Sequence, residues 1–176
     1  MKTAPLPKQL DLRGLAARGA TIAGTVSSAD LPRLASVGVR LSEPAQATLR
    51  LSQDEAGRAV VDAEVSTTAV LQCQRCLQDM SWPLAISTLL ACAWTDEEAA
   101  ALPGVYVPLL VEADANLWDI VEEELLLALP AFPLHENDCK TAEQAAALAT
   151  PEEVESALSD DADKQNPFGV LEQLKN

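Results

Sequence analysis

Aromatic residues are scarce in this sequence: three Trp, two Phe and one Tyr make up 3% of the chain. Because 48% of the residues are nevertheless hydrophobic, we expect a real core, which has to be built from Leu, Val, Ile and Ala. The length of 176 residues suits one domain with tails.

Signatures of catalysis are missing as well. The chain has a single histidine, His135, and no glycine-rich phosphate loop, Gly-x-Ser-x-Gly or His-Glu-x-x-His motif. Carboxylates are plentiful, but they stand in charge runs, where a solvated surface is the ordinary interpretation. The sequence therefore predicts a protein that is not an enzyme.

Long hydrophobic runs are also absent. No stretch approaches the roughly 20 apolar residues of a membrane-spanning helix. Residues 1–10 hold two prolines and no apolar run, which is unlike a signal peptide. We expect a cytoplasmic protein with no membrane partner, whose four cysteines are reduced or metal-bound rather than paired.

Positive charge is sparse beyond the first third of the chain. Residues 1–58 hold eight Lys/Arg and five Asp/Glu, a net charge of +3, and residues 59–176 hold four and twenty-two, a net charge of −18, so the chain totals −15. An acidic body repels phosphate, so broad nonspecific nucleic-acid binding is not expected. A negative surface suits a basic protein partner; the alternative is that the charge serves only solubility.

Alternating hydrophobicity predicts three long strands. Apolar and polar residues alternate over 45–52 and, after a turn at 53–57, again over 59–73. A third run with apolar residues at alternate positions covers 82–94. The short connections between these runs predict an antiparallel meander.

Shorter elements surround this meander. We expect strands over 21–26 and 106–111, the second at an edge because of Pro108, and short helices over 30–36 and 96–102. The clearest helix covers 116–129, since Asn116 can cap it and Pro130 ends it.

These patterns predict an α+β protein with an antiparallel, curved sheet that could be barrel-like, one long packing helix and an acidic, partly disordered C-terminal tail. The expected organisation is an N-terminal lead over 1–20, a single α+β domain over 21–135, an acidic linker over 136–164 and a short docking segment over 165–176. In that last segment, Phe168, Leu171 and Leu174 recur at helical spacing, and they could dock on the domain or in a partner's groove.

Four residues in two distant pairs form a candidate metal site. The motif Cys73-Gln74-Arg75-Cys76 ends the second long strand, and His135 and Cys139 follow 58 residues later. Together they supply the four ligands of a tetrahedral zinc site, if the fold brings them together. The alternatives are ordinary reduced cysteines with a surface histidine, or a redox dithiol, which usually opens a helix rather than a hairpin turn. Cys92 falls in an apolar phase and is expected in the core.

One carboxylate interrupts the apolar face of the predicted helix over 116–129. At ~100° per residue, Glu124 falls inside this face, whereas Glu122 and Glu123 lie outside it. Burial of a carboxylate requires a partner. We expect Arg75 to be this partner, linking the hairpin turn to the helix; the alternative is an exposed helix end with a solvated Glu124.

Several motifs resemble the YceD family, the bacterial large ribosomal RNA subunit accumulation proteins. They are Leu71-Gln72-Cys73-Gln74-Arg75-Cys76, Ala101-Leu102-Pro103 with Tyr106 and Pro108, Glu122-Glu123-Glu124-Leu125-Leu126-Leu127-Ala128-Leu129-Pro130, Pro133-Leu134-His135, Cys139, and Asn166-Pro167-Phe168 with Leu171 and Leu174. Their order and spacing hold from about residue 60 to the end, and the first 50 residues match loosely.

The resemblance implies a role in synthesis, processing or stability of large-subunit ribosomal RNA, without enzymatic activity. Family genes often neighbour one for a small basic ribosomal protein, which fits binding of a basic ribosomal or RNA-processing protein and direct or indirect contact with ribosomal RNA. Some relatives carry cysteine in place of His135, which implies a metal site in those proteins. The other interpretations are a zinc-stabilised RNA-binding module and a Cys-x-x-Cys redox protein.

Overall fold

The computed structural model describes residues 4–112 and 114–140. The chain divides into two units between Glu136 and Asn137, and the fold described here is that of the first. The docking segment over 165–176, with Phe168, Leu171 and Leu174, and the acidic linker from residue 141 onward lie outside the described residues.

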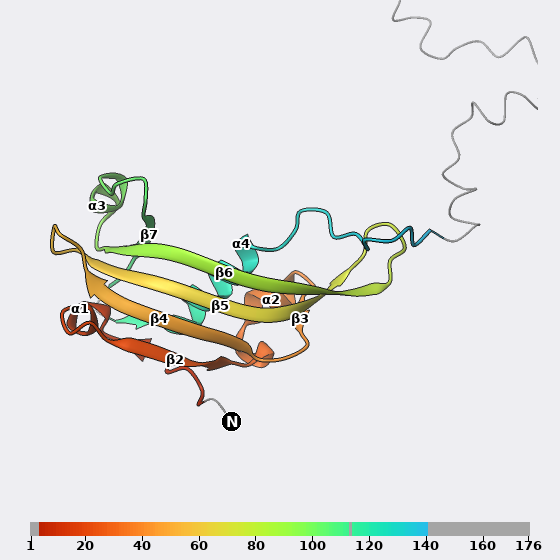
Figure 1. Cartoon of the computed structure of the whole chain (residues 1–176), viewed down its shortest axis with the longest axis horizontal. Helices are drawn as coiled ribbons and strands as arrows, with labels where there is room; N and C mark the ends of the chain where they lie inside the picture. The colour runs from red at the N-terminus through yellow and green to blue at the C-terminus, as the bar shows by residue number, and fades with distance from the viewer. Residues whose placement is uncertain (1–3, 113, 141–176) are drawn as a thin grey trace, which may run out of the picture. The chain divides into compact units, whose positions relative to one another are not determined.

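A single main sheet organises the first unit (Figure 1). Its strands lie in the order β2 (Thr21–Val26), β4 (Ala45–Gln53), β5 (Ala59–Gln72), β6 (Asp79–Ala93) and β7 (Val107–Leu110), and β3 (Arg40–Leu41) also pairs with β5. The long strands and their connections agree with the predicted meander, and the α+β class is confirmed.

The prediction of a purely antiparallel, barrel-like sheet is wrong in two respects. β7 pairs with β6 in parallel, whereas the other pairs are antiparallel. Parallel neighbours need a crossover, and here the chain crosses through α3 (Asp96–Ala100), whose N-cap Thr95 accepts a hydrogen bond from the Glu98 amide. Within the described residues β2 and β7 end the strand order without pairing with each other, so the sheet stays open.

Alternation along the strands buries one face of the sheet. Val61, Ala63 and Val65 of β5 are at most 2% exposed, while Asp62 and Glu64 between them point to the other face. The helix α4 (Leu117–Leu127) packs on β5 and β6, and α2 (Pro32–Ser36) packs on α4. The largest fully buried side chains are aliphatic apart from Cys73 and one glutamate, as the scarcity of aromatics predicts.

Part of the lead over 1–20 is built into this fold. β1 (Gln9–Leu10) pairs with β8 (Ala115–Asn116), and α1 (Leu12–Ala16), capped by Asp11, packs on β4 and β5. The chain before β1 runs beside β2, where the Leu6 amide donates to the Thr25 carbonyl at 2.9 Å. No helix in the described part of the chain is long and apolar enough to cross a membrane.

Candidate metal centre

The first cysteine pair lies in the tight turn between β5 and β6, residues 73–78. The Leu77 amide donates to the Cys73 carbonyl at 2.8 Å, and the Cys73 amide donates to the Gln78 carbonyl at 2.9 Å. Leu77 has a φ of 61°, a left-handed conformation, and is 60% exposed, so packing of its side chain does not stabilise the turn. Cys73 and Cys76 are both buried. The predicted position in a hairpin turn is therefore confirmed.

The chain after α4 returns to this turn and brings His135 to Cys76. The Gln74 amide donates to the Pro133 carbonyl at 2.9 Å, and Arg75 Nη2 donates to the His135 carbonyl at 2.9 Å. Cys76 Sγ lies 3.4 Å from His135 Nδ1. Three contacts thus fasten residues 133–135 to residues 74–76.

Of the four predicted ligands, Cys73, Cys76 and His135 lie in the first unit, whereas Cys139 belongs to the second unit. Around a tetrahedral zinc ion, bond lengths of about 2.3 Å to sulfur and 2.0–2.1 Å to nitrogen separate such donors by roughly 3.6–3.8 Å. All four cysteines of the chain carry thiols rather than disulfides. The first unit therefore brings three of the four predicted candidates together, and zinc binding stays a prediction.

Cys92, the remaining cysteine, lies in the core near the far end of β6 and is 3% exposed, as predicted. Burial raises the pKa of its thiol to about 11, although the nearby Arg13 acts in the opposite direction. At neutral pH the group is therefore a protonated thiol, which is a poor nucleophile. Its environment gives no support to a catalytic role.

The predicted link between Arg75 and Glu124 is wrong. Glu124 is 6% exposed, and its Oε2 accepts a hydrogen bond from Thr88 Oγ1 at 2.6 Å. Thr88 lies nine residues along β6 from Asp79, at the hairpin turn, which is about 30 Å at ~3.3 Å per residue. This distance is far beyond the reach of an arginine side chain, and Arg75 donates to His135 instead. The alternative of a solvated Glu124 is also wrong.

Glu122 is a buried functional group that the helical periodicity misplaced. It is 2% exposed, and its Oε1 accepts hydrogen bonds from the amides of Arg33 at 2.7 Å and Leu34 at 3.0 Å. These amides belong to the first turn of α2, whose N-cap Leu31 offers no side-chain hydrogen bond. Glu122 therefore caps a helix 88 residues away in the chain, which no local pattern could indicate.

Acidic side chains surround a groove of about 360 Å³ between β7 and α4, which we call the acidic groove. Its lining includes Leu109, Leu110 and Ile120 and the carboxylates of Glu112, Asp114, Asp119 and Glu123. Arg33 also lines it and forms an ion pair with Glu123 at 2.5 Å, and this hydrogen bond raises the pKa of Arg33. The sequence between Arg75 and Lys140 contains no Lys or Arg, which explains the sign of this surface.

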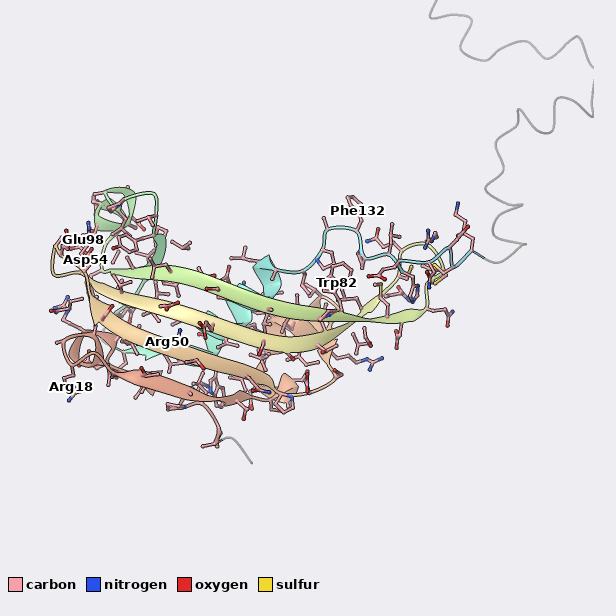
Figure 2. The ribbon with its side chains drawn as sticks, in the orientation of Figure 1. Arg18, Arg50, Asp54, Trp82, Glu98 and Phe132 are labelled. Atoms are coloured by element: carbon pink, nitrogen blue, oxygen red, sulfur yellow. The ribbon has the colours of Figure 1, made fainter. Side chains whose placement is uncertain are left out.

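Three further arginines of the basic first third form ion pairs with carboxylates. Ion pairs join Arg40 to Asp79, Arg58 to Asp54, and Arg50 to Asp62 and Glu64. Figure 2 shows Arg50 in the middle of the exposed face of the sheet and Asp54 at one end of it. Together with Arg33, four of the eight Lys and Arg residues of this region therefore form ion pairs with carboxylates.

Comparison with known proteins gives one family. The family model described as "Large ribosomal RNA subunit accumulation protein YceD" matches residues 61–175. A Haemophilus influenzae protein of that name is 31% identical over 179 residues, which cover 99% of this chain and 99% of that protein. No solved structure matches the chain. The matched residues include most of β5, all of β6 and α4, and the four residues predicted as metal ligands.

Proposed function

Because the chain belongs to the YceD family of large ribosomal RNA subunit accumulation proteins, we propose that it supports the synthesis, processing or stability of large-subunit ribosomal RNA in the cytoplasm. The observation that carries this proposal is the similarity to the Haemophilus influenzae relative, which runs over 99% of both chains. The chain acts as a factor without enzymatic activity, in line with its lack of catalytic motifs and its protonated Cys92.

The mechanism we propose is capture of a basic ribosomal or RNA-processing protein in the acidic groove. The groove combines carboxylates with apolar side chains such as Leu110, which is 56% exposed. A Lys- or Arg-rich segment suits both, since its charged ends can meet the carboxylates while its aliphatic stems lie on the apolar floor. Complementary charge also speeds the encounter with a basic partner.

Ribosomal RNA is then reached through the partner rather than by direct contact. Direct binding draws on exposed cations, and four of the eight Lys and Arg residues of the first third are engaged with carboxylates: Arg33, Arg40, Arg50 and Arg58. The second candidate function, a zinc-stabilised RNA-binding module, has the cluster of Cys and His donors in its favour and the net charge of −18 after residue 58 against it.

Crosslinking followed by pulldown of the full chain from cells, at low and high salt, tests this mechanism. The wild type should recover basic large-subunit or RNA-processing proteins. When the salt is added before the crosslinker, recovery should be lower at high salt, because salt screens the attraction between opposite charges. The groove variant Glu112→Lys/Asp114→Lys/Asp119→Lys should recover roughly 10-fold less or worse, because like charges repel.

The matched control variant is Asp30→Lys/Glu43→Lys/Glu55→Lys, which reverses three exposed acids outside the groove and changes the net charge equally. It should recover the same proteins as the wild type. Equal losses in both variants, or no ribosomal or RNA-processing protein in any sample, would contradict the mechanism. Ribosomal RNA crosslinked directly to this chain would favour the second candidate.

A further inference from the structure

The outer edge of β7 offers backbone groups to a further strand. The Val111 amide, at the end of β7, donates to the Ala93 carbonyl of β6 at 3.0 Å. Because the backbone groups of successive residues in a strand point to opposite sides, the amide and the carbonyl of Leu110 point away from β6. Among the described residues no strand pairs with this side of β7. The edge is therefore open.

The other edge of the main sheet, β2, is covered by the chain itself. Residues 4–6 run beside it, where the Thr25 amide donates to the Ala4 carbonyl at 3.0 Å and the Thr25 carbonyl accepts from the Leu6 amide at 2.9 Å. Proteins usually cover or blunt such edges, because unpaired backbone groups attract other strands. β7 is blunted only by Pro108, which lacks an amide hydrogen but keeps an outward carbonyl.

The side chains along this edge are apolar and exposed. Val107 is 44% exposed and Leu110 is 56% exposed. Leu109 and Leu110 also line the acidic groove, which has a volume of about 360 Å³. In an added strand successive side chains point to opposite faces, so a segment paired with β7 would direct every second side chain toward the groove.

The charge beside β7 indicates which kind of strand fits. Glu112, Asp114 and Asp119 line the groove, and the guanidinium of Arg33, which also lines it, is paired with Glu123. Pairing of β7 with the β7 of a second copy would bring two acidic grooves together, which like-charge repulsion opposes. A Lys- or Arg-rich strand has the complementary charge.

We propose that a Lys- or Arg-rich segment of the protein partner binds β7 as an added edge strand of the main sheet. Its backbone pairs with the outward groups of Pro108 and Leu110, and its basic side chains lie in the acidic groove. Backbone pairing provides affinity in this mode of binding, and the alternate side chains provide specificity. This inference rests on the proposed function, because it specifies how the basic partner occupies the groove.

Binding of synthetic peptides to the purified full chain tests the proposal. The probe is a fluorescently labelled octapeptide that alternates lysine with valine. Its control has proline in place of each valine, which keeps the charge but cannot pair as a strand. In fluorescence anisotropy at low salt, we expect the lysine–valine peptide to bind roughly 10-fold more tightly, since a few backbone hydrogen bonds are together worth about that factor.

Two variants separate backbone pairing from side-chain contact. Leu110→Pro removes the outward amide without removing a bond to β6, so it should abolish the roughly 10-fold preference for the lysine–valine peptide. Leu110→Ala keeps the amide and is the matched control, which should retain the preference. Slow hydrogen exchange at the Val111 amide reports that β7 is still paired with β6 in each variant.

Hydrogen exchange in the wild type tests the contact even if Leu110→Pro disturbs β7. Saturating lysine–valine peptide should slow exchange of the Leu110 amide by about 10-fold or more, because that amide gains an acceptor. The lysine–proline peptide at the same occupancy should leave this exchange unchanged.

The outcomes distinguish this proposal from the proposed function. Equal affinity for the two peptides, no binding of the lysine–valine peptide, or unchanged exchange of the Leu110 amide in the bound state would each overturn the added strand. Capture of a basic partner by charge would then still stand or fall by the crosslinked pulldown. Exchange of the Leu110 amide that slows with rising protein concentration, in the absence of peptide, would overturn the proposal in favour of pairing between two copies.

Discussion

At the scale of single residues, two buried glutamates tie α4 to different parts of the fold. Glu122 accepts hydrogen bonds from the backbone amides of Arg33 and Leu34, and Glu124 accepts one from the hydroxyl of Thr88. Charged side chains are seldom buried unless hydrogen-bonded, because an unmatched charge is costly in a core. These two carboxylates therefore fix how α4 sits against α2 and β6.

Replacing Glu122 should be far more costly than replacing its neighbour Glu123. Glu122→Ala leaves two buried amides of α2 without their acceptor, so we expect the free energy of unfolding to fall by about 2–4 kcal/mol. Urea denaturation of both variants measures this difference. Glu122→Gln should recover part of the loss, since its carbonyl oxygen can accept the same bonds.

Glu123→Ala is the matched control for this prediction. Its carboxylate lies on the surface and pairs with the exposed guanidinium of Arg33, with side chains 49% and 54% exposed. Exposed ion pairs contribute little to stability. A Glu123→Ala variant less stable than Glu122→Ala would contradict the assignment of the cap to Glu122.

Asp54 should make the stability of the β4–β5 turn depend on pH. Hydrogen bonds from the Arg58 amide and side chain and from the Ala56 amide hold the pKa of Asp54 below its ordinary value of 3.8. Because the folded pKa is lowered, the ionised carboxylate stabilises the fold fully above pH ~3.8, and this contribution disappears as the pH falls through the lower, folded value.

The difference in unfolding free energy between wild type and Asp54→Asn should therefore be constant from pH 7 to about pH 5 and shrink below pH ~4. Urea denaturation at a series of pH values gives this difference directly. Glu55→Gln, an exposed acid in the same turn, serves as the control. A difference that grows on acidification would have the wrong sign for a lowered pKa.

At the scale of elements, the N-terminal segment depends on a glycine in β2. A Cβ atom on Gly24 would lie 2.6 Å from the Leu6 Cα and amide nitrogen, which are backbone atoms that can move only together with their strand. Leu6 is 1% exposed, and its carbonyl also accepts a hydrogen bond from Trp118 Nε1 at 2.9 Å. Residues 4–6 can therefore pack between β2 and α4 only because residue 24 has no side chain.

Gly24→Ala should lower the free energy of unfolding by about 1–3 kcal/mol, the usual cost of overpacking a core. Hydrogen exchange at the Leu6 and Thr25 amides should accelerate, because the bonds they donate across this contact are displaced. Gly104→Ala, where nothing lies within 4 Å of the new Cβ, is the control. Unchanged exchange at Leu6 in Gly24→Ala would contradict the close approach.

The elements differ in how much of their structure could be predicted from the sequence. Alternation sets the registers and faces of β4, β5 and β6, and Asn116 marks the start of α4, since its side chain accepts from the Trp118 amide at 3.1 Å. The two-residue pairing of β1 with β8 has no local pattern to predict it. The parallel pairing of β7 depends on where the chain emerges after α3, which is a property of the tertiary fold. Gly24 inside β2 does carry a signal in the sequence, because glycines within strands often mark a close backbone approach.

The candidate metal centre was predictable in composition but not in all of its connections. Cys73, Cys76, His135 and Cys139 could be chosen from residue type and spacing alone. The role of Arg75 could not, because its partner is a backbone carbonyl that only the return of the chain after α4 brings to the turn.

At the scale of the whole molecule, acidic side chains are neutralised by arginines in some regions and stand without basic neighbours in the sequence in another. Arginines of the first third neutralise acids on the sheet and on α4, whereas the segment between Arg75 and Lys140 supplies only acids and His135. The result is an acidic groove beside the edge strand β7.

The central claim is that the chain supports the accumulation of large-subunit ribosomal RNA, and the ratio of large- to small-subunit ribosomal RNA in cells depleted of it tests this claim most directly. The ratio should fall on depletion and return when the wild type or the control variant is supplied, and it should stay low with the groove variant. An unchanged ratio after complete depletion would contradict the account.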